Sequence, residues 1–237
     1  MTPLETVRDL LAMQSPARGA TIIDGGAHHG AFARKALEIF DGARILAFEP
    51  DPDSFSKAQT ALAERKTVEI VNAALGAKPG RAEFFRGAFS ATNSLLARPA
   101  GAGKPYFPPG AALASGGDVA VTTIDSECAR RGISTLDLLK LDLQGGELDA
   151  LNGASALLER GGAAIVLCEV VFVEKYERQP LFWRIWEALA KYGYSFFSLE
   201  DLKIGLYHDE APGMRQRQWN QADAIFLSPS LRRSLDR

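Results

Sequence analysis

The stretch from residue 21 to residue 49 limits the fold of this chain more than any other part. An apolar run ends in Asp24 and leads into a glycine-rich turn over residues 25–30. A helical pattern follows, and a second apolar run, residues 45–48, ends in Glu49. A strand, a tight turn, a helix and a second strand predict a βαβ unit. In such units the glycine turn lets backbone amides approach a nucleoside-bearing cofactor.

The two acids indicate which cofactor this turn would accept. An acid that closes the second strand can accept hydrogen bonds from ribose hydroxyls, and we expect this role for Glu49. Asp24 would repel the pyrophosphate of a dinucleotide and attract the ammonium group of S-adenosylmethionine. Gly25, Gly26 and Gly30 are therefore expected to form the cofactor turn, although a strand-to-helix turn without a ligand would use the same glycines.

Composition excludes several classes of protein. The chain has 237 residues and a formal net charge of -2 at pH 7, so it has no global basic field for nucleic acid or anionic lipid. No apolar run approaches the ~20 residues that a membrane span needs. The two cysteines, Cys128 and Cys168, form no disulfide framework. We therefore expect a cytoplasmic protein that binds neither nucleic acid nor membrane.

Strand and helix patterns alternate along the chain. Several strand candidates are near-continuous apolar runs, which is typical of strands covered by helices on both faces. The pattern predicts an α/β fold with a doubly wound, mostly parallel, Rossmann-like sheet. The last strand is expected to be antiparallel, because the segment before it lacks the helix that a parallel return needs. The expected strands are residues 20–25, 43–49, 68–74, 136–142, 163–170, 194–199 and 222–228.

Residues 1–19 are expected to form an N-terminal helical extension, and residues 20–237 a single domain with inserted segments. A turn signal at 76–80 and the strand-like residues 81–86 predict a hairpin at one edge of the sheet. Residues 87–118 are rich in Gly, Ala, Pro and Ser and predict a long loop.

A second loop is expected over residues 201–221, leaving from the carboxyl end of a strand. We expect the two loops to form the walls of the acceptor pocket. Arg215 and Arg217 would suit carboxylates or phosphates, and Trp219 would stack on a sugar. The alternative is a solvated loop whose Trp219 packs on the core.

The run from Leu138 to Glu147 contains the second group of candidate site residues. Strand alternation places Lys140 and Asp142 on one face, and a buried lysine must find a partner. Asp142 is expected at the carboxyl end of its strand, where it would line the site, and Glu169 closes the next strand. These two acids could act as a catalytic base, bind a divalent cation or hold Lys140. Glu147 is either a site residue or a helix N-terminal acid.

His28 and His29 lie within the glycine turn. Imidazole titrates near neutrality, so either residue could act as a general base or a metal ligand. We expect instead that they line the turn, one towards the cofactor and one towards solvent, because adjacent residues diverge in direction.

The order of these motifs resembles the FkbM family of S-adenosylmethionine-dependent methyltransferases, over residues 20 to 228. The matching segments are D-G-G-A-H-H-G, F-E-P-D-P-D-S-F, V-N-A-A-L-G, V-T-T-I-D, L-L-K-L-D-L-Q-G-G-E and C-E-V. The family more often has asparagine and an aliphatic residue in place of His28 and His29, and glutamate in place of Gln144. The resemblance implies a class I fold and transfer of a methyl group to a hydroxyl of a sugar, glycan or secondary metabolite.

The resemblance also implies roles for individual residues. Asp24, Gly26 and Gly30 would hold the methionine end of the cofactor, and Glu49 its ribose. Asn72 or Ala73 would face the adenine. Asp142 would lie near the sulfonium, and Asp142 and Glu169 are the candidate bases.

Two other functions remain open from the sequence. An NAD-binding oxidoreductase would carry the pattern G-x-G-x-x-G, and here Ala27 occupies its middle glycine position. A non-catalytic module that binds S-adenosylmethionine would keep the turn and lack transfer. A divalent metal is possible at Asp142 and Glu169 but is not predicted, and the sequence does not identify the small-molecule or carbohydrate acceptor.

Overall fold

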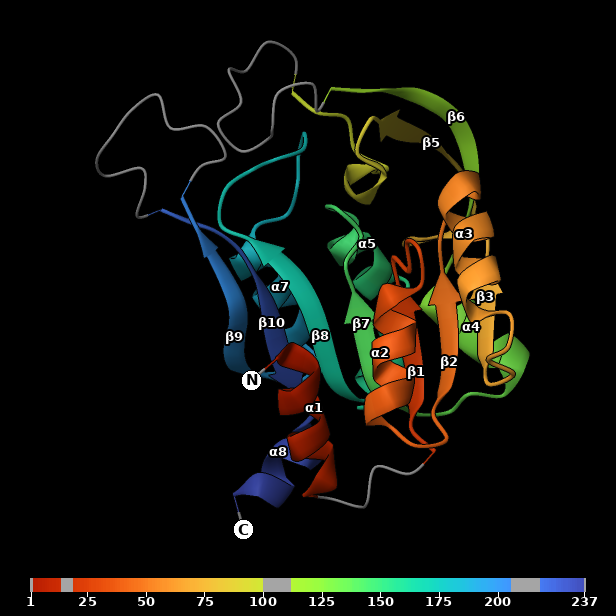
Figure 1. The fold of residues 1–237 in the computed structure, drawn as a ribbon. Helices are drawn as coiled ribbons and strands as arrows, with labels where there is room; N and C mark the ends of the chain where they lie inside the picture. The colour runs from red at the N-terminus through yellow and green to blue at the C-terminus, as the bar shows by residue number, and fades with distance from the viewer. Residues whose placement is uncertain (1, 14–18, 100–111, 206–217, 237) are drawn as a thin grey trace.

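A computed structural model describes residues 2–13, 19–99, 112–205 and 218–236. Its centre is a seven-stranded sheet with helices on both faces (Figure 1). The strands β3, β2, β1, β7 and β8 are parallel, and β10 is antiparallel to both of its neighbours. This confirms the predicted doubly wound sheet and its antiparallel last strand. The spatial order is β3 (Val68–Val71), β2 (Arg44–Phe48), β1 (Thr21–Gly25), β7 (Leu136–Leu141), β8 (Ala163–Val171), β10 (Trp219–Leu227) and β9 (Ser195–Ile204).

The helices form a layer on each face of this sheet. One layer consists of α1 (Pro3–Ala12), α2 (Ala31–Ile39), α3 (Pro52–Leu62) and α8 (Pro229–Leu235). The other consists of α4 (Ile124–Arg131), α5 (Glu147–Asn152), α6 (Ser155–Glu159) and α7 (Phe182–Ala190). No helix among the described residues is long and apolar enough to cross a membrane.

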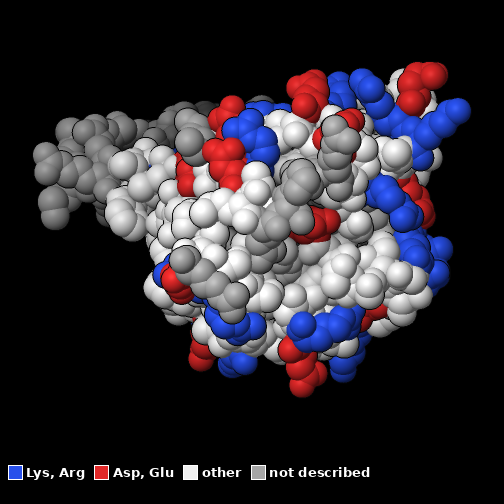
Figure 2. All heavy atoms as spheres, turned by 90° about the horizontal axis from the view of Figure 1, so that it is seen from below, with Lys and Arg blue, Asp and Glu red and all other residues white. Residues whose placement is uncertain are grey.

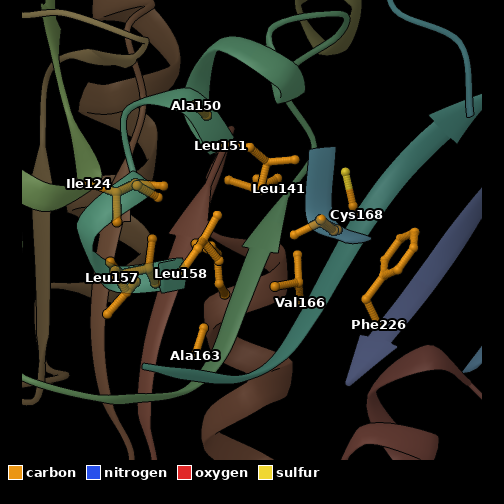
Figure 3. Packing of buried hydrophobic residues seen from close by; sticks show 14 of the residues in the cluster. Ile124, Leu141, Ala150, Leu151, Leu157, Leu158, Ala163, Val166, Cys168 and Phe226 are labelled. Carbon is orange, nitrogen blue, oxygen red and sulfur yellow. The ribbon is translucent and has the colours of Figure 1, made fainter. Parts of the chain in front are cut away.

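Burial on both faces explains the continuous apolar run of β8. Ile165 packs in the cluster under α1 and α2, whereas the next residue, Val166, packs in the cluster under α5 and α6. Figure 3 shows the second cluster, where Leu141 and Val166 of the strands meet Leu151 and Leu158 of the helices. Since both sides of the strand are dry, no position in the run is free to be polar.

The strand order places a topological switch point between β1 and β7. From β1 the chain builds outward through β2 to β3, and then crosses to β7 on the opposite side of β1. Asp24 on β1 lies beside Lys140 on β7 in the sheet register. Ligands of open α/β sheets bind outside the carboxyl ends of the strands at such a point.

A separate three-stranded sheet lies beyond β3 in the chain, in the order β4 (Ala74–Leu75), β6 (Leu113–Thr122), β5 (Gly80–Gly87). The predicted strand 68–74 is therefore interrupted after Val71. The predicted hairpin strand is present as β5, but it pairs with β6 rather than with an edge of the main sheet. The predicted loop 87–118 contains the 3₁₀ helix η1 (Ser90–Thr92) and the first part of β6. β9 and β10 extend into the predicted loop 201–221 from both sides, so residues 201–204 and 219–221 are strand rather than loop.

Candidate active site

The turn after β1 has a shape that only glycine accommodates. Gly26 has φ 77°, and a Cβ atom there would lie 1.9 Å from the carbonyl oxygen of Asp142. Gly30 also has φ 77°, and a Cβ atom there would lie 2.7 Å from a side chain of α3. The N–H groups of Gly26 and Ala27 both donate to the carbonyl oxygen of Phe48, at 3.0 and 2.9 Å. The turn is thus attached to the end of β2 and presses against the end of β7.

The side chain of Lys140 on β7 is hydrogen-bonded to this turn. Its Nζ donates to Asp24 Oδ1 at 3.0 Å and to the carbonyl oxygens of Gly25 and Gly26 at 3.0 and 2.9 Å. The sequence left the partner of Lys140 open, and the structure identifies it as Asp24. Asp24 is fully buried, and its Oδ2 has no hydrogen-bond partner among the described residues.

Glu49 follows β2 as predicted and faces a cavity. Its Oε2 accepts from the N–H of His28 at 2.7 Å, and its Oε1 accepts from the N–H of Asp51 at 2.8 Å. The side chain is 6% exposed, and burial raises the pKa of Glu49 to about 7. A carboxylate offers about four acceptor positions, so two remain for hydroxyl donors of a ligand.

His28 and His29 do not diverge as the sequence suggested. Their rings stack with centroids 3.6 Å apart. His28 has φ 48°, a strained value for a residue with a side chain, and its Nε2 lies 2.9 Å from Ser90 Oγ. Burial and the neighbouring His29 lower the pKa of His28.

Asn72 and Ala73 lie where β3 ends. Asn72 Nδ2 donates to the carbonyl oxygens of Glu49 and Pro50, at 2.8 and 3.2 Å. Asn72 therefore ties the end of β3 to the end of β2. Ala73 is buried and lines the cavity beside Glu49.

Two adjoining cavities lie at the carboxyl ends of β1, β2 and β7. The first has a volume of about 170 Å³ and extends from Glu49 and Ala73 to Phe84 of β5 and Asn93 after η1. The small sheet therefore supplies one wall, which the sequence did not predict residue by residue.

The second cavity, of about 330 Å³, lies on the α1 and α2 side and shares Gly26, His28 and Asp142 with the first. Lys35, Asp201 and Asp223 also line it. Burial, together with the charges of Asp142 and Asp201, raises the pKa of Asp223 to about 6. No pattern in the sequence marked Asp223, whose place depends on the pairing of β10 with β8.

Asp142 directly follows β7, as predicted, whereas Glu169 lies within β8, two residues before its end, because the pairing with β10 continues to Val171. Only Asp142 lines the two cavities. The side-chain amide of Gln144 lies between the two acids, with Nε2 2.9 Å from Asp142 Oδ1 and 3.0 Å from Glu169 Oε2. Burial and the charges of Asp142 and Glu147 raise the pKa of Glu169 well above its ordinary value. The sequence marked Gln144 only as a departure from a familiar motif.

The side chain of Glu147 accepts hydrogen bonds from the backbone of the turn before α5. Its Oε1 accepts from the N–H of Leu143 at 2.7 Å, and both of its oxygens accept from the N–H of Gly145. Burial raises the pKa of Glu147 to about 7. The side chain closes the turn that precedes α5, as the helix-start interpretation predicted.

The second predicted loop is only partly described. Arg215 and Arg217 lie outside the described residues. Trp219 is 49% exposed and packs edge-on against Phe172, with ring centroids 5.4 Å apart. Among the described residues, no group of three or more His, Cys, Asp and Glu side chains is arranged to hold a metal ion.

The glycine turn, the acid after β2 and the motif around Lys140 coincide with a known domain family. The profile of the methyltransferase FkbM domain matches residues 24–196 of this chain. The chain belongs to the FkbM methyltransferase family. Its sheet is accordingly that of a class I, Rossmann-like methyltransferase fold.

Curated relatives of the family are distant. The 2-O-methyltransferase NoeI of Sinorhizobium fredii is 25% identical over 162 residues, which cover 67% of this chain and 66% of that protein. Ribosomal RNA small subunit methyltransferase H of Brucella ovis is 30% identical over 128 residues, which cover 54% of this chain and 31% of that protein. The chain thus spans less than two thirds of the length of either relative.

Solved structures with a similar trace include two methyltransferase-fold proteins. Precorrin-6y C5,15-methyltransferase of Geobacter metallireducens aligns with a TM-score of 0.49 at 13% identity, over 96% of this chain and 90% of that chain. Fibrillarin of Aeropyrum pernix, solved with bound S-adenosyl-L-methionine, aligns with a TM-score of 0.46 at 16% identity, over 93% of this chain and 76% of that chain.

Proposed function

We propose that this protein transfers a methyl group from S-adenosylmethionine to a hydroxyl of a sugar, glycan or secondary metabolite. The observation that carries the proposal is Glu49, a buried carboxylate beside the glycine turn with acceptor positions directed at a cavity. Membership of the FkbM family supports methyl transfer. The relative that is itself a 2-O-methyltransferase supports a hydroxyl as the acceptor.

The residues around the first cavity fit the adenosine half of the cofactor. Glu49 would accept hydrogen bonds from the two ribose hydroxyls. Ala73 and Phe84 offer an apolar slot for the adenine, and Asn72 would hold the strand end that shapes it.

The methionine half would cross Gly26 towards the second cavity. There Asp142 and Asp223 would attract its ammonium group and Lys35 its carboxylate. Asp24 would act through Lys140, which fixes the carbonyl oxygens of the turn. The unpartnered Oδ2 of Asp24 is a further acceptor for an ammonium or a water molecule.

S-adenosylmethionine, when bound, supplies a methyl group on a positively charged sulfur. The acceptor oxygen forms a bond to this methyl group as the sulfur–carbon bond breaks, and the hydroxyl proton must leave. Asp142 would take that proton, since it lines both cavities, whereas Glu169 lines neither. The walls around the turn would hold the two reactants in line, which contributes much of the rate of such a displacement.

The formal net charge of -2 supports a small acceptor rather than RNA. Figure 2 shows the face opposite the carboxyl ends of the parallel strands, where Lys and Arg side chains are interspersed with Asp and Glu. The buried free thiols of Cys128 and Cys168 support the expected reducing, cytoplasmic setting.

Calorimetry and a transfer assay test the proposal. S-adenosylhomocysteine is expected to bind with micromolar affinity and NAD to show no binding. The protein would then be incubated with labelled S-adenosylmethionine and a panel of hydroxylated sugars, oligosaccharides, phenols, amines and RNA. A methyl ether in the hydroxyl arm supports the proposal. Binding of S-adenosylhomocysteine without methyl transfer to any member of the panel favours a non-catalytic module. Transfer only to RNA or amines contradicts the proposed acceptor class. Binding of NAD alone contradicts the proposed cofactor.

A further inference from the structure

Gln144 has an unusual backbone and an unusual position. It lies in the turn after β7 with φ 52°, in the left-handed region that a residue with a side chain rarely adopts. Such a conformation is strained and persists where the surroundings hold the residue in place. The proposed reaction assigns Gln144 no role, although it lines the first cavity.

The side chain of Gln144 joins two acids that would otherwise repel each other. Its Nε2 donates to Asp142 Oδ1 at 2.9 Å and to Glu169 Oε2 at 3.0 Å. A side-chain amide nitrogen donates two hydrogen bonds, and here one goes to each acid. Its two N–H bonds occupy the place where two carboxylates would share a cation.

The other end of the amide is held firmly. The hydroxyl of Tyr176 lies 2.9 Å from Gln144 Oε1 and 2.9 Å from the carbonyl oxygen of Thr92, with one proton to donate between them. Tyr176 is fully buried. Ser94 Oγ donates to the backbone carbonyl oxygen of Gln144 at 2.7 Å. The segment around η1 and the segment after β8 thus fix both the orientation and the position of the amide.

Glu169 is held on its second oxygen as well. Gln221 Nε2 donates to Glu169 Oε1 at 2.9 Å, and Gln221 Oε1 accepts from the buried Lys175. Glu169 is therefore fixed between two amides and does not reach the cavities. Through Gln144 it acts only on the orientation of Asp142.

We propose that Gln144 is a positioning residue that stands in for a bridging cation, holding Asp142 towards the reacting atoms so that transfer needs no metal ion. The bridging role rests on the contacts above, whereas the catalytic consequence rests on the proposed function of Asp142. If Gln144 does replace a cation, its conversion to a carboxylate should create a cation site from three acids, residues 142 and 144 after β7 and Glu169 within β8.

Manganese binding to Gln144→Glu tests the bridge without any acceptor. Calorimetry with MnCl₂ is expected to show no binding to the wild type and binding to the variant at about 10⁻⁴–10⁻³ M. The double variant Gln144→Glu/Glu169→Gln should lose this binding. Gln59→Glu, on an exposed position of α3, is the control for added charge and should bind no Mn²⁺.

Gln144→Ala provides a second variant should Gln144→Glu not fold. It opens the space between the two acids, and it should bind Mn²⁺ weakly. Absence of Mn²⁺ binding in both variants overturns the proposal, as does wild-type binding that Glu169→Gln abolishes.

Turnover tests the positioning role separately. For an acceptor that the wild type methylates, Gln144→Ala is expected to lower kcat at least tenfold while changing KM for S-adenosylmethionine by less than threefold. MnCl₂ should restore part of kcat in Gln144→Glu. Unchanged kcat would refute the positioning role. Failure of the wild type to bind S-adenosylhomocysteine would refute the proposed function and leave the manganese result standing.

Discussion

Substitution of Glu49 by glutamine separates the charge of this side chain from its shape. Burial raises the pKa of Glu49 to about 7, whereas an exposed glutamate ionises near 4.5. The folded protein therefore binds the proton more tightly than the unfolded chain, so stability from this group is full below pH 4.5 and is lost as pH rises through 7. At pH 8 the shift of about 2.5 units corresponds to roughly 3 kcal/mol.

The variant should consequently be more stable than the wild type at high pH and weaker in binding. It keeps one of the two acceptor oxygens, so the lost bond to a backbone N–H subtracts about 1 kcal/mol from the gain. A net gain of about 2 kcal/mol in unfolding free energy is expected at pH 8, falling towards zero or below at pH 5. Loss of charged hydrogen bonds to the ribose should weaken binding by about 1–2 kcal/mol, or roughly 5- to 30-fold.

The pH dependence of 5′-methylthioadenosine binding measures this directly. The ligand has the ribose and adenine but no group that titrates between pH 5 and 9. Wild-type affinity is expected to fall as pH drops below 7 and to level off at a total loss of roughly 5- to 30-fold near pH 5, and Glu49→Gln should show a flat profile. Glu147→Gln is the matched control, since burial also raises the pKa of Glu147 to about 7 but its side chain lines neither cavity. A flat wild-type profile, or one that survives in Glu49→Gln, would refute the assignment of the ribose to Glu49.

Three further substitutions test the turn and the base. Gly26→Ala places a Cβ atom 1.9 Å from a backbone oxygen, so it should abolish S-adenosylhomocysteine binding and lower the free energy of unfolding by roughly 3 kcal/mol or more. Gly132→Ala is the control, at φ 65° with open space around it. It should lower the free energy of unfolding by only about 1–2 kcal/mol and leave binding intact. Lys140→Met leaves Asp24 buried without its cation and should lower the free energy of unfolding, measured in urea, by about 3–5 kcal/mol. Additional Asp24→Asn substitution should partly reverse this loss. An unaltered midpoint of the urea unfolding curve in Lys140→Met would contradict the reasoning. Asp142→Asn should lower turnover ~10²-fold at saturating cofactor and give no response to a chelator. It should also weaken cofactor binding, because Asp142 would face the ammonium group, and full activity in the folded variant would remove Asp142 as the base.

Local patterns in the sequence were sufficient for most of the large sheet. Apolar runs that end in an acid located β1, β2 and β7 to within one or two residues, because strands covered on both faces are mostly apolar and a polar residue within them, such as Lys140, needs a buried partner. The lack of a helical pattern before the last strand predicted that β10 is antiparallel. The positions of Glu49 and Asp142 at strand ends followed from the same periodicity.

The small sheet could not be predicted in the same way. Residues 113–118 of β6 include Gly116 and Gly117 and have low strand propensity, and their strand state depends on pairing with β5 some thirty positions earlier. As a result, the wall of the first cavity and the contacts that fix Gln144 were not visible in the sequence.

Partners and proton affinities were likewise decided by tertiary structure. Lys140 and Asp24 are 116 residues apart, and only the pairing of β1 with β7 brings them together. The pKa of Glu49 is raised because surrounding residues exclude water, a property that no local pattern encodes. The sequence by itself determined where most strands of the large sheet end and which acids lie there, since backbone periodicity is local. Contacts between segments distant in the chain decided which of those acids is neutralised, which is bridged and which faces a cavity.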